Sequence, residues 1–299
     1  MQTKEAKGHL HPISRAIFDI RSIFEELGFA IAIGPELETE WYNFDALNIP
    51  KDHPARDMQD TFWIKNPERK AQSTEHKNQT KHNAQNTNGE RSERQVLRTH
   101  TSPVQIRYME EKLKAGVKPP YKIIVPGKVF RNEATDATHE AQFFQLEGLY
   151  VDKNVSMAHL KGVLEFFFKK FFGPEVEIRF RPSFFSFTEP SAEVDMFLPS
   201  PPARGEKRIL GASQDLERSS SNAKGVQLRY GGDKRGGGRW LEMVGSGLVH
   251  PNVLKAAGVP EGYSGFAFGC GIDRLVMVKY GIPDIRMFYN GDLRLVNQF

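Results

Sequence analysis

Several residue types that bind phosphate lie close together in the middle of the chain. The stretch FRNEATDATHEAQFF carries Arg131, Glu133, His139 and Phe143. Arginine offers a planar fork of donors that suits phosphate or carboxylate, and an aromatic face stacks on a purine. Arg131 and Glu133 alone read more readily as an exposed ion pair, which contributes little. Together with the histidine and the phenylalanine, they predict a nucleotide site.

A second such group lies near the C-terminus, in the sequence GFAFGCGIDRL. Its glycines allow close backbone approach, and Arg274 follows them at the start of a predicted helix. A third segment, near the N-terminus, is an amphipathic stretch that ends in ELGFAIAIGP, with Pro35 after a short strand. The three segments together predict a site assembled from distant parts of the chain.

The central group needs a rigid support, and the flanking sequence predicts one. The runs YKIIVPGKVF and FFQLEGLYV are rich in β-branched and aromatic residues, so we expect an antiparallel hairpin over 121–151. The runs VEIRFRP, FSFTEPSAEVDMFL and WLEMVGSGL predict further strands. Because these strands follow one another without regular crossover helices, we expect an α+β fold, a largely antiparallel sheet flanked by helices.

Two helices are predicted from apolar periodicity. Residues 12–27 place Ile13, Ile17, Ile20 and Phe24 on one stripe, which faces either the chain's own core or a partner subunit. Residues 156–172 form the other helix, with a serine at its start and Gly173 at its end.

In chain order, helix–strand–proline, F-R-x-E and G-x-G-x-x-R resemble the three signature motifs of class II aminoacyl-tRNA synthetases. The segments NFDALNIPKDHPARDMQDTFW, LRTHTSPVQIR, RFRPSFFSFTEPSAEVDM, LVHPNVL and YSGFAFG resemble the catalytic alpha subunits of bacterial phenylalanyl-tRNA synthetases. The resemblance implies that residues 1–299 form one catalytic domain. Its expected reaction is ATP-dependent activation of L-phenylalanine to phenylalanyl-adenylate, followed by transfer to tRNA(Phe).

The resemblance also assigns expected roles in ATP binding. Arg131 bridges the amino acid carboxylate and the α-phosphate, and Arg274 holds the γ-phosphate; these two are the expected catalytic residues. Phe143 stacks under adenine, His139 meets the outer phosphates, and Glu133 accepts from the adenine amino group.

The expected phenylalanine pocket follows from T-H-T-S, Q-L-E, F-F-S-F and G-F-A-F-G. Taken alone, a pair of phenylalanines is more often part of an ordinary aromatic core. Alanine at the floor of the pocket leaves room for a benzyl group. The resemblance implies that the pocket residues are His100, Ser102, Arg131, Gln145, Glu147, Phe185, Phe187 and Ala267.

Magnesium is the expected cofactor, because it joins triphosphates through carboxylates and phosphate oxygens. The resemblance implies that Glu189 is a ligand of a Mg2+ ion shared with the beta subunit. Glu242 is a second candidate, with a solvent-facing position on a sheet as the alternative. The family's usual glutamate before Arg274 is Asp273 here, a shorter acid that we expect to reach its partner less well.

Composition is typical of a globular protein, and the lack of a membrane-helix run and of a signal peptide predicts a cytoplasmic one. The single cysteine, Cys270, excludes an intrachain disulfide framework and a multi-cysteine zinc site, and its glycine neighbours favour a packing role. The net charge of +4 is compatible with a polyanionic partner. The resemblance implies a heterotetramer of two alpha and two beta subunits that binds tRNA(Phe).

Two segments are expected to be flexible insertions, 66–95 and 199–238. The first is almost free of apolar residues, and the second is rich in Pro, Gly and Ser. The span from Pro199 to Arg239 carries nine Lys or Arg and four acids, a net +5, so it reads first as a solvated loop and second as a nucleic-acid contact. The chain begins almost directly at the catalytic region, and we expect the helical coiled-coil arm of bacterial alpha subunits to be absent.

Two other classes of function fit part of the pattern. A non-catalytic paralogue keeps the fold but usually loses the phosphate-binding arginines, and Arg131 and Arg274 are both present. An ATP-dependent amide ligase shares the fold, but the F-F-S-F-T-E-P and G-F-A-F-G matches argue against it.

Overall fold

The computed structural model describes residues 9–57, 60–64, 94–199 and 238–299. The two predicted insertions, 66–95 and 199–238, lie outside the described residues except at their edges. At those edges the predicted bounds were slightly too wide, because Gln95 already begins a strand and Pro199 pairs with Gly238 in the main sheet.

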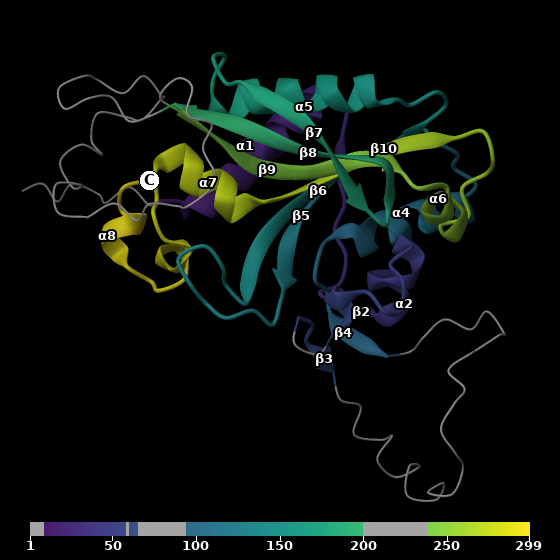
Figure 1. The fold of residues 1–299 in the computed structure, drawn as a ribbon, viewed down its shortest axis with the longest axis horizontal. Coiled ribbons are helices and arrows are strands. Elements are labelled where there is room, and N and C mark those ends of the chain that lie inside the picture. Colours follow the sequence, from purple (N-terminus) through teal and green to yellow (C-terminus); the bar gives the residue numbers. More distant parts are fainter. Residues whose placement is uncertain (1–8, 58–59, 65–93, 200–237) are drawn as a thin grey trace, which may run out of the picture.

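A seven-stranded sheet is the centre of the fold (Figure 1), with the strand order β1-β5-β6-β10-β9-β8-β7. Only β1 and β5 pair in parallel; every other neighbouring pair in the sheet is antiparallel. The α+β prediction is therefore confirmed. The strands are β1 (Ala30–Ile31), β5 (Tyr121–Phe130), β6 (Gln142–Asp152), β7 (Ile178–Phe185), β8 (Thr188–Pro199), β9 (Gly238–Val249) and β10 (Ser264–Gly271).

The predicted central hairpin is formed by β5 and β6. Their register runs from Tyr121 opposite Val151 to Phe130 opposite Gln142. Strand β10 then pairs with the other edge of β6, so the glycine-rich motif lies directly beside the hairpin. Two of the three segments that were predicted to form the site are therefore neighbours in the sheet, joined by backbone hydrogen bonds.

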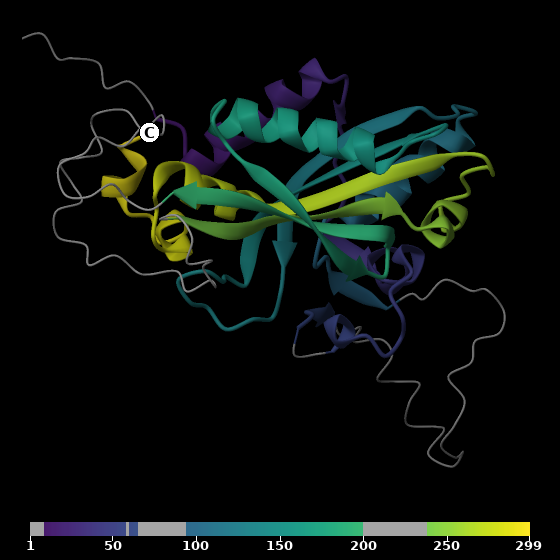
Figure 2. The same ribbon diagram turned by 45° about the horizontal axis from the view of Figure 1, so that its top comes forward.

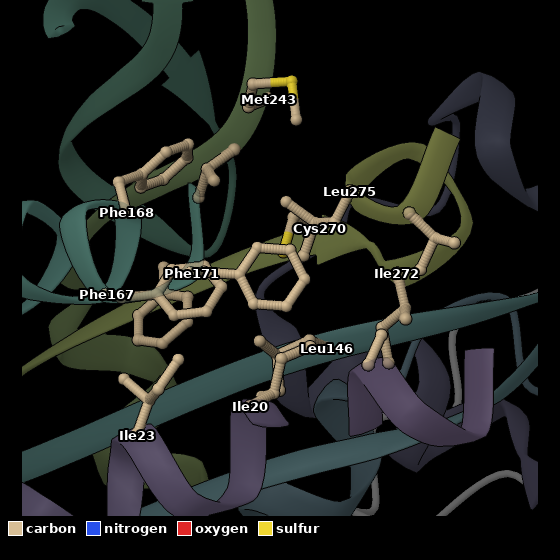
Figure 3. Close-up of a cluster of buried hydrophobic side chains, with 14 of the residues drawn as sticks. Ile20, Ile23, Leu146, Phe167, Phe168, Phe171, Met243, Cys270, Ile272 and Leu275 are labelled. Atoms are coloured by element: carbon tan, nitrogen blue, oxygen red, sulfur yellow. The ribbon is translucent and has the colours of Figure 1, made fainter. Parts of the chain in front are cut away.

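Three helices cover one face of the sheet: α1 (Pro12–Glu26), α5 (Met157–Phe172) and α7 (Ile272–Tyr280). Figures 1 and 2 show α5 and α1 on this side. Figure 3 shows the core beneath them, where Ile20 of α1 and Phe171 of α5 lie near Leu146 of β6. Cys270 points into the same core and is 5 % exposed, which confirms its packing role.

The apolar stripe of α1 packs into this core rather than onto a partner. Ile13, Ile20 and Phe24 are at most 2 % exposed within the single chain, and Ile17 is partly buried. Of the two alternatives that periodicity left open, intramolecular packing is the one observed. The side chain of Phe18, by contrast, is 55 % exposed.

Capping at the predicted helix ends agrees with the sequence. Ser156 and His159 form a reciprocal capping box at the start of α5, and Gly173 ends it with φ of 120°, a conformation that favours glycine. At the start of α1, the His11 ring accepts a hydrogen bond from the Ile13 amide.

The opposite face of the sheet carries a second core and a small three-stranded sheet, β2-β4-β3. Its strands are β2 (Leu37–Thr39), β3 (Trp63–Ile64) and β4 (Gln95–Leu97). The helices on this side and at the C-terminus are α2 (Glu40–Asn43), η1 (Asp45–Leu47), η2 (Pro54–Arg56), α4 (Ser102–Lys114), α6 (Pro251–Ala256), η5 (Ile285–Phe288) and α8 (Leu293–Val296). Within the described parts of the chain, every helix is too short or too polar to span a membrane.

Candidate active site

A pocket of about 300 Å³ opens where the β5–β6 loop, β9 and the β10–α7 junction meet. It brings together all the residues that were expected to bind ATP, from two distant parts of the sequence. Its lining includes Arg131, Glu133, His139, Phe143 and Arg274.

Arg131 follows β5 directly and is held in place by backbone. Its Nε donates to the Thr99 carbonyl oxygen at 3.2 Å, and its guanidinium carbon lies 5.1 Å from the centre of the Phe143 ring. The Glu133 carboxylate is 4.0 Å from Nη1, a distance that makes only a loose ion pair. The Arg131 side chain is 40 % exposed, so the guanidinium is presented to a ligand beside an aromatic platform.

Arg274 lies in the first turn of α7, which begins immediately after β10. Its Nη1 donates to the backbone oxygen of Glu242 at 3.2 Å, which ties the arginine to β9. The N-terminus of α7 adds the partial positive charge of a helix dipole. Both arginines and this helix end favour an anionic ligand in the pocket.

His139 is oriented by an acid that sequence reasoning did not single out. Its Nδ1 lies 3.0 Å from both carboxylate oxygens of Asp136, and the Asp136 carboxylate also accepts from the amides of Thr138 and His139. These hydrogen bonds hold the pKa of Asp136 well below its usual range. The same hydrogen bonds fix the orientation of the His139 ring on the pocket lining.

Glu147 is the centre of a buried polar cluster beside the pocket. Its carboxylate accepts from the Thr101 amide at 3.1 Å, the Ser102 hydroxyl at 2.5 Å, and the side-chain amides of Gln105 and Gln145 at 2.9 Å each. Glu147 is only 4 % exposed, and burial raises its pKa to about 7, although the donors oppose that shift. Gln145 and Glu147, two positions apart in β6, therefore lie on one face of the strand.

Gln145 joins this cluster to the pocket, because it also lines the pocket wall. Its Oε1 is buried and has no hydrogen-bond partner within the described residues. Reversing the amide would place that oxygen against the Glu147 carboxylate, so the orientation is well determined. A substrate that carries a donor would satisfy it.

His100 contributes a neutral ring. Both of its ring nitrogens are buried. Burial, reinforced by the charge of Arg131, lowers the pKa of His100 to about 3.

Phe185 and Phe187 stack with ring centres 5.6 Å apart and planes 11° from parallel. Both are only partly buried, unlike the fully enclosed phenylalanines of the core. A methyl group added at Gly245, which lines the pocket, would lie 3.1 Å from the Phe185 ring. Ala267 pairs with Gly247 in the β10–β9 ladder and packs against the second core; it is not among the residues that line the pocket.

Comparison with known proteins decides the family. All 299 residues match the family described as the tRNA synthetases class II core domain (F). The chain is 44 % identical to the phenylalanine–tRNA ligase alpha subunit of Dechloromonas aromatica, covering 99 % of this chain and 71 % of that protein. It is 46 % identical to the alpha subunit of Shouchella clausii, covering 98 % and 69 %. The chain belongs to this family of alpha subunits.

A solved structure shares the fold of this chain. The pyrrolysyl-tRNA synthetase of Desulfitobacterium hafniense aligns with a TM-score of 0.58 over 93 % of this chain and 73 % of its own. At 14 % identity, that likeness supports the class II fold alone.

The two acids considered for magnesium occupy different places in this class II synthetase. Glu242 lines the pocket, and burial together with the charge of Glu193 raises its pKa. Glu189 is not among the pocket-lining residues; its side chain is 76 % exposed, with His250 Nε2 at 3.4 Å. The described residues hold no cluster of three His, Cys, Asp or Glu side chains suited to a metal. Each acid therefore fits an ion whose other ligands come from phosphate or from a partner.

Two expectations about individual residues need correction or extension. Asp273 does reach its partners despite its length: it accepts from the Phe144 amide at 2.7 Å and from the Tyr289 hydroxyl at 2.5 Å. Gln105 was not predicted as a site residue; it lies three positions after Ser102 in α4, a spacing that places both on one side of the helix.

Proposed function

We propose that this chain is the catalytic alpha subunit of a phenylalanine–tRNA ligase. In the first step the carboxylate of L-phenylalanine attacks the α-phosphorus of ATP, the bond to the β-phosphate oxygen breaks, and pyrophosphate leaves. In the second step a hydroxyl of the terminal ribose of tRNA(Phe) attacks the carbonyl carbon of the adenylate, and AMP leaves. The observation that carries the proposal is the contact between a two-arginine nucleotide pocket and a buried, amine-accepting cluster, made through Gln145.

The protein's contribution to the first step is positioning and electrostatic stabilisation. Two anions must approach while charge builds on the α-phosphate, and Arg131 is placed to contact both. Arg274 and the start of α7 hold the far phosphates, Phe143 stacks under adenine, and Glu133 accepts from the adenine amino group. The position of these four residues on the pocket lining supports these roles.

At the amino-acid end, the substrate ammonium group donates to Gln145 Oε1, which has no partner among the described residues, and is attracted by the negative charge of the neighbouring Glu147 carboxylate. The neutral ring of His100 and the Ser102 hydroxyl complete the polar side. The benzyl ring packs against Phe185 and Phe187 above a floor that contains Ala267.

Magnesium is the cofactor that this chemistry requires, because it neutralises triphosphate charge. The Glu242 carboxylate fits an ion that takes its other ligands from ATP. The exposed carboxylate of Glu189 fits an ion shared with a beta subunit, since it supplies a single acidic ligand at the surface.

The assembly that we propose is a heterotetramer of two alpha and two beta subunits, acting in the cytoplasm on tRNA(Phe). The alpha-subunit relatives support the existence of a beta partner through their name.

ATP–pyrophosphate exchange measured across all twenty amino acids, with and without a co-expressed beta subunit, tests the proposal. We expect exchange with phenylalanine alone among them. No exchange under any condition would favour a non-catalytic paralogue. Exchange with another amino acid, together with release of a free amide, would favour an amide ligase.

A further inference from the structure

The pocket wall contains a hydrogen-bonded chain that runs from the C-terminal segment into the hairpin. The Tyr289 hydroxyl donates to Asp273 Oδ1 at 2.5 Å, and Asp273 Oδ2 accepts from the Phe144 amide at 2.7 Å. Phe144 neighbours Phe143, the aromatic residue that lines the pocket beside Arg131.

The register of the sheet explains why the Phe144 amide needs a side chain. Strand β10 ends at Gly271, opposite Gln145 of β6. Phe144 precedes Gln145 in β6, so it lies beyond the last pair of this ladder. Its amide therefore has no carbonyl acceptor from β10. Asp273, in the first turn of α7, supplies the acceptor that the strand does not.

Tyr289, at one end of this hydrogen-bonded chain, lies in a firmly anchored segment. Phe288, its neighbour, is 6 % exposed in the main core, and the Phe288 backbone oxygen lies 3.0 Å from His11 Nε2 at the start of α1. A separate link runs from the Ile285 amide to the Ala137 carbonyl oxygen in the β5–β6 loop, at 2.9 Å. The C-terminal segment thus contacts both the β5–β6 loop and the start of α7, two segments whose residues line the pocket.

Asp273 is one methylene shorter than the glutamate expected before Arg274. It is 1 % exposed, and burial raises its pKa to about 6, while the hydrogen bonds from Tyr289 and Phe144 oppose the rise. A buried carboxylate with a single donor would be poorly satisfied, and the tyrosine supplies the second donor.

We propose that Tyr289 is a positioning residue for ATP: it holds the Asp273 carboxylate on the Phe144 amide and so fixes the Phe143 ring and the neighbouring wall of the nucleotide pocket. The inference rests on the proposed function for the identity of the nucleotide. It goes beyond that function in making the C-terminal segment part of the ATP site and in pairing this tyrosine with the shorter acid.

A double-mutant cycle tests the proposal in the protein co-purified with its partner subunit. The variants are Tyr289→Phe, Asp273→Glu and the two combined. The matched control is Tyr150→Phe, because Tyr150 donates to Asp152 Oδ2 at 3.0 Å at the far end of the same strand β6. Titration calorimetry gives the ATP dissociation constant, exchange kinetics give the KM for phenylalanine, and melting temperatures report folding.

We expect Tyr289→Phe to raise the ATP dissociation constant about tenfold, the usual scale for a lost hydrogen bond to a charged group, with the phenylalanine KM unchanged. Asp273→Glu alone crowds the tyrosine hydroxyl and also weakens ATP binding. In the combined variant the longer acid occupies the space of the lost hydroxyl, and ATP affinity returns to near the wild-type value. The control leaves both constants unchanged.

Unchanged ATP affinity in Tyr289→Phe, an equal loss for ATP and phenylalanine, or a combined variant no better than Tyr289→Phe would each overturn the proposal. If the wild-type protein binds ATP but catalyses ATP–pyrophosphate exchange only with a different amino acid, the proposed function fails. The same dissociation constants then still decide for or against Tyr289, because they do not depend on the amino acid.

Discussion

Arg131 is the residue on which the proposed chemistry depends most. Its guanidinium is fixed by the Thr99 carbonyl oxygen and lies beside Phe143, so it is positioned before any ligand binds. A donor that is preorganised where charge develops contributes more to the transition state than to the ground state.

We therefore expect Arg131→Ala to lower ATP–pyrophosphate exchange by about 100-fold or more, on the order of 3 kcal/mol, because one preorganised donor to the α-phosphate is lost. The control is Arg21→Ala, which removes an exposed arginine paired with Glu25 on α1. A fall of less than about tenfold, equivalent to ~1.4 kcal/mol, would remove Arg131 from the central role.

Glu147 gives a prediction about pH. Burial raises the pKa of this carboxyl to about 7, so the ionised form grows as pH rises from 6 to 8. If the ionised form holds the substrate ammonium group, the KM for phenylalanine should rise by up to about tenfold for each unit of pH below 7, because one proton must be lost before binding. The measurement is exchange kinetics between pH 6 and 8.

Two variants control this experiment. Glu147→Gln should bind phenylalanine weakly and without this pH dependence, whereas Glu110→Gln should keep the wild-type profile, since the buried Glu110 carboxylate accepts from the Tyr42 hydroxyl and does not line the pocket. A phenylalanine KM that is constant over this range in the wild-type protein would contradict the assignment of Glu147.

Sequence reasoning named the residues of the pocket whose roles follow from local motifs, such as the arginines and Phe143, and the structure places those residues on one wall. Their roles remain predictions. Sequence reasoning missed Tyr289 and Asp136, because each acts on a residue whose own position is known only after folding. Tyr289 lies 16 positions from Asp273 in the chain. Asp136 reads as one polar loop residue among many.

At the scale of elements, the pairing of β6 with β10 leaves little room for a side chain at one position on the main-core face of the sheet. Gly148 faces Phe268 across this pair of strands, and Phe268 stacks on Phe24 of α1 in the main core. A Cβ at position 148 would lie 2.2 Å from the Phe268 ring. The glycine is therefore required by packing rather than by its backbone conformation.

We expect Gly148→Ala to destabilise the protein by about 1–3 kcal/mol, because the core must shift to admit the methyl group. Gly162→Ala is the matched control: a Cβ there meets nothing within 4 Å in helix α5, and alanine should stabilise the helix by about 1 kcal/mol. Thermal unfolding of both variants checks the opposite signs. Equal melting temperatures would mean that the contact with Phe268 is easily relieved.

The hairpin, the helix bounds and the antiparallel sheet were predictable because each depends on periodicity and capping within a short window. The partner of the α1 stripe was not, since burial of Ile13 and Ile20 looks the same from sequence whether the covering surface belongs to the chain or to another subunit. The parallel pairing of β1 with β5 was also beyond local reasoning, because β1 is only two residues long.

At the scale of the whole molecule, the described residues join the pocket and the Glu147 cluster through Gln145, while Glu189 is not among the pocket-lining residues. A single exposed acid binds Mg2+ weakly, because the ion needs several oxygen ligands. The proposed assembly with a beta subunit gives that acid a function that the chain alone does not.

We therefore expect co-expression with a beta subunit to give a heterotetramer that charges tRNA(Phe), and the isolated chain to charge it poorly or not at all. Light scattering after size exclusion reports the assembly, and aminoacylation reports the activity.

Glu189→Ala should leave the melting temperature of the isolated chain unchanged, since the side chain is 76 % exposed, but should weaken the assembly in the presence of magnesium. Glu175→Ala, at another exposed position, is the control. Arg131→Ala should assemble normally and fail to charge, which separates the two readouts. An isolated monomer that charges tRNA(Phe) as fast as the co-expressed complex would contradict the proposed assembly and would mean that the pocket in this chain is sufficient for both steps.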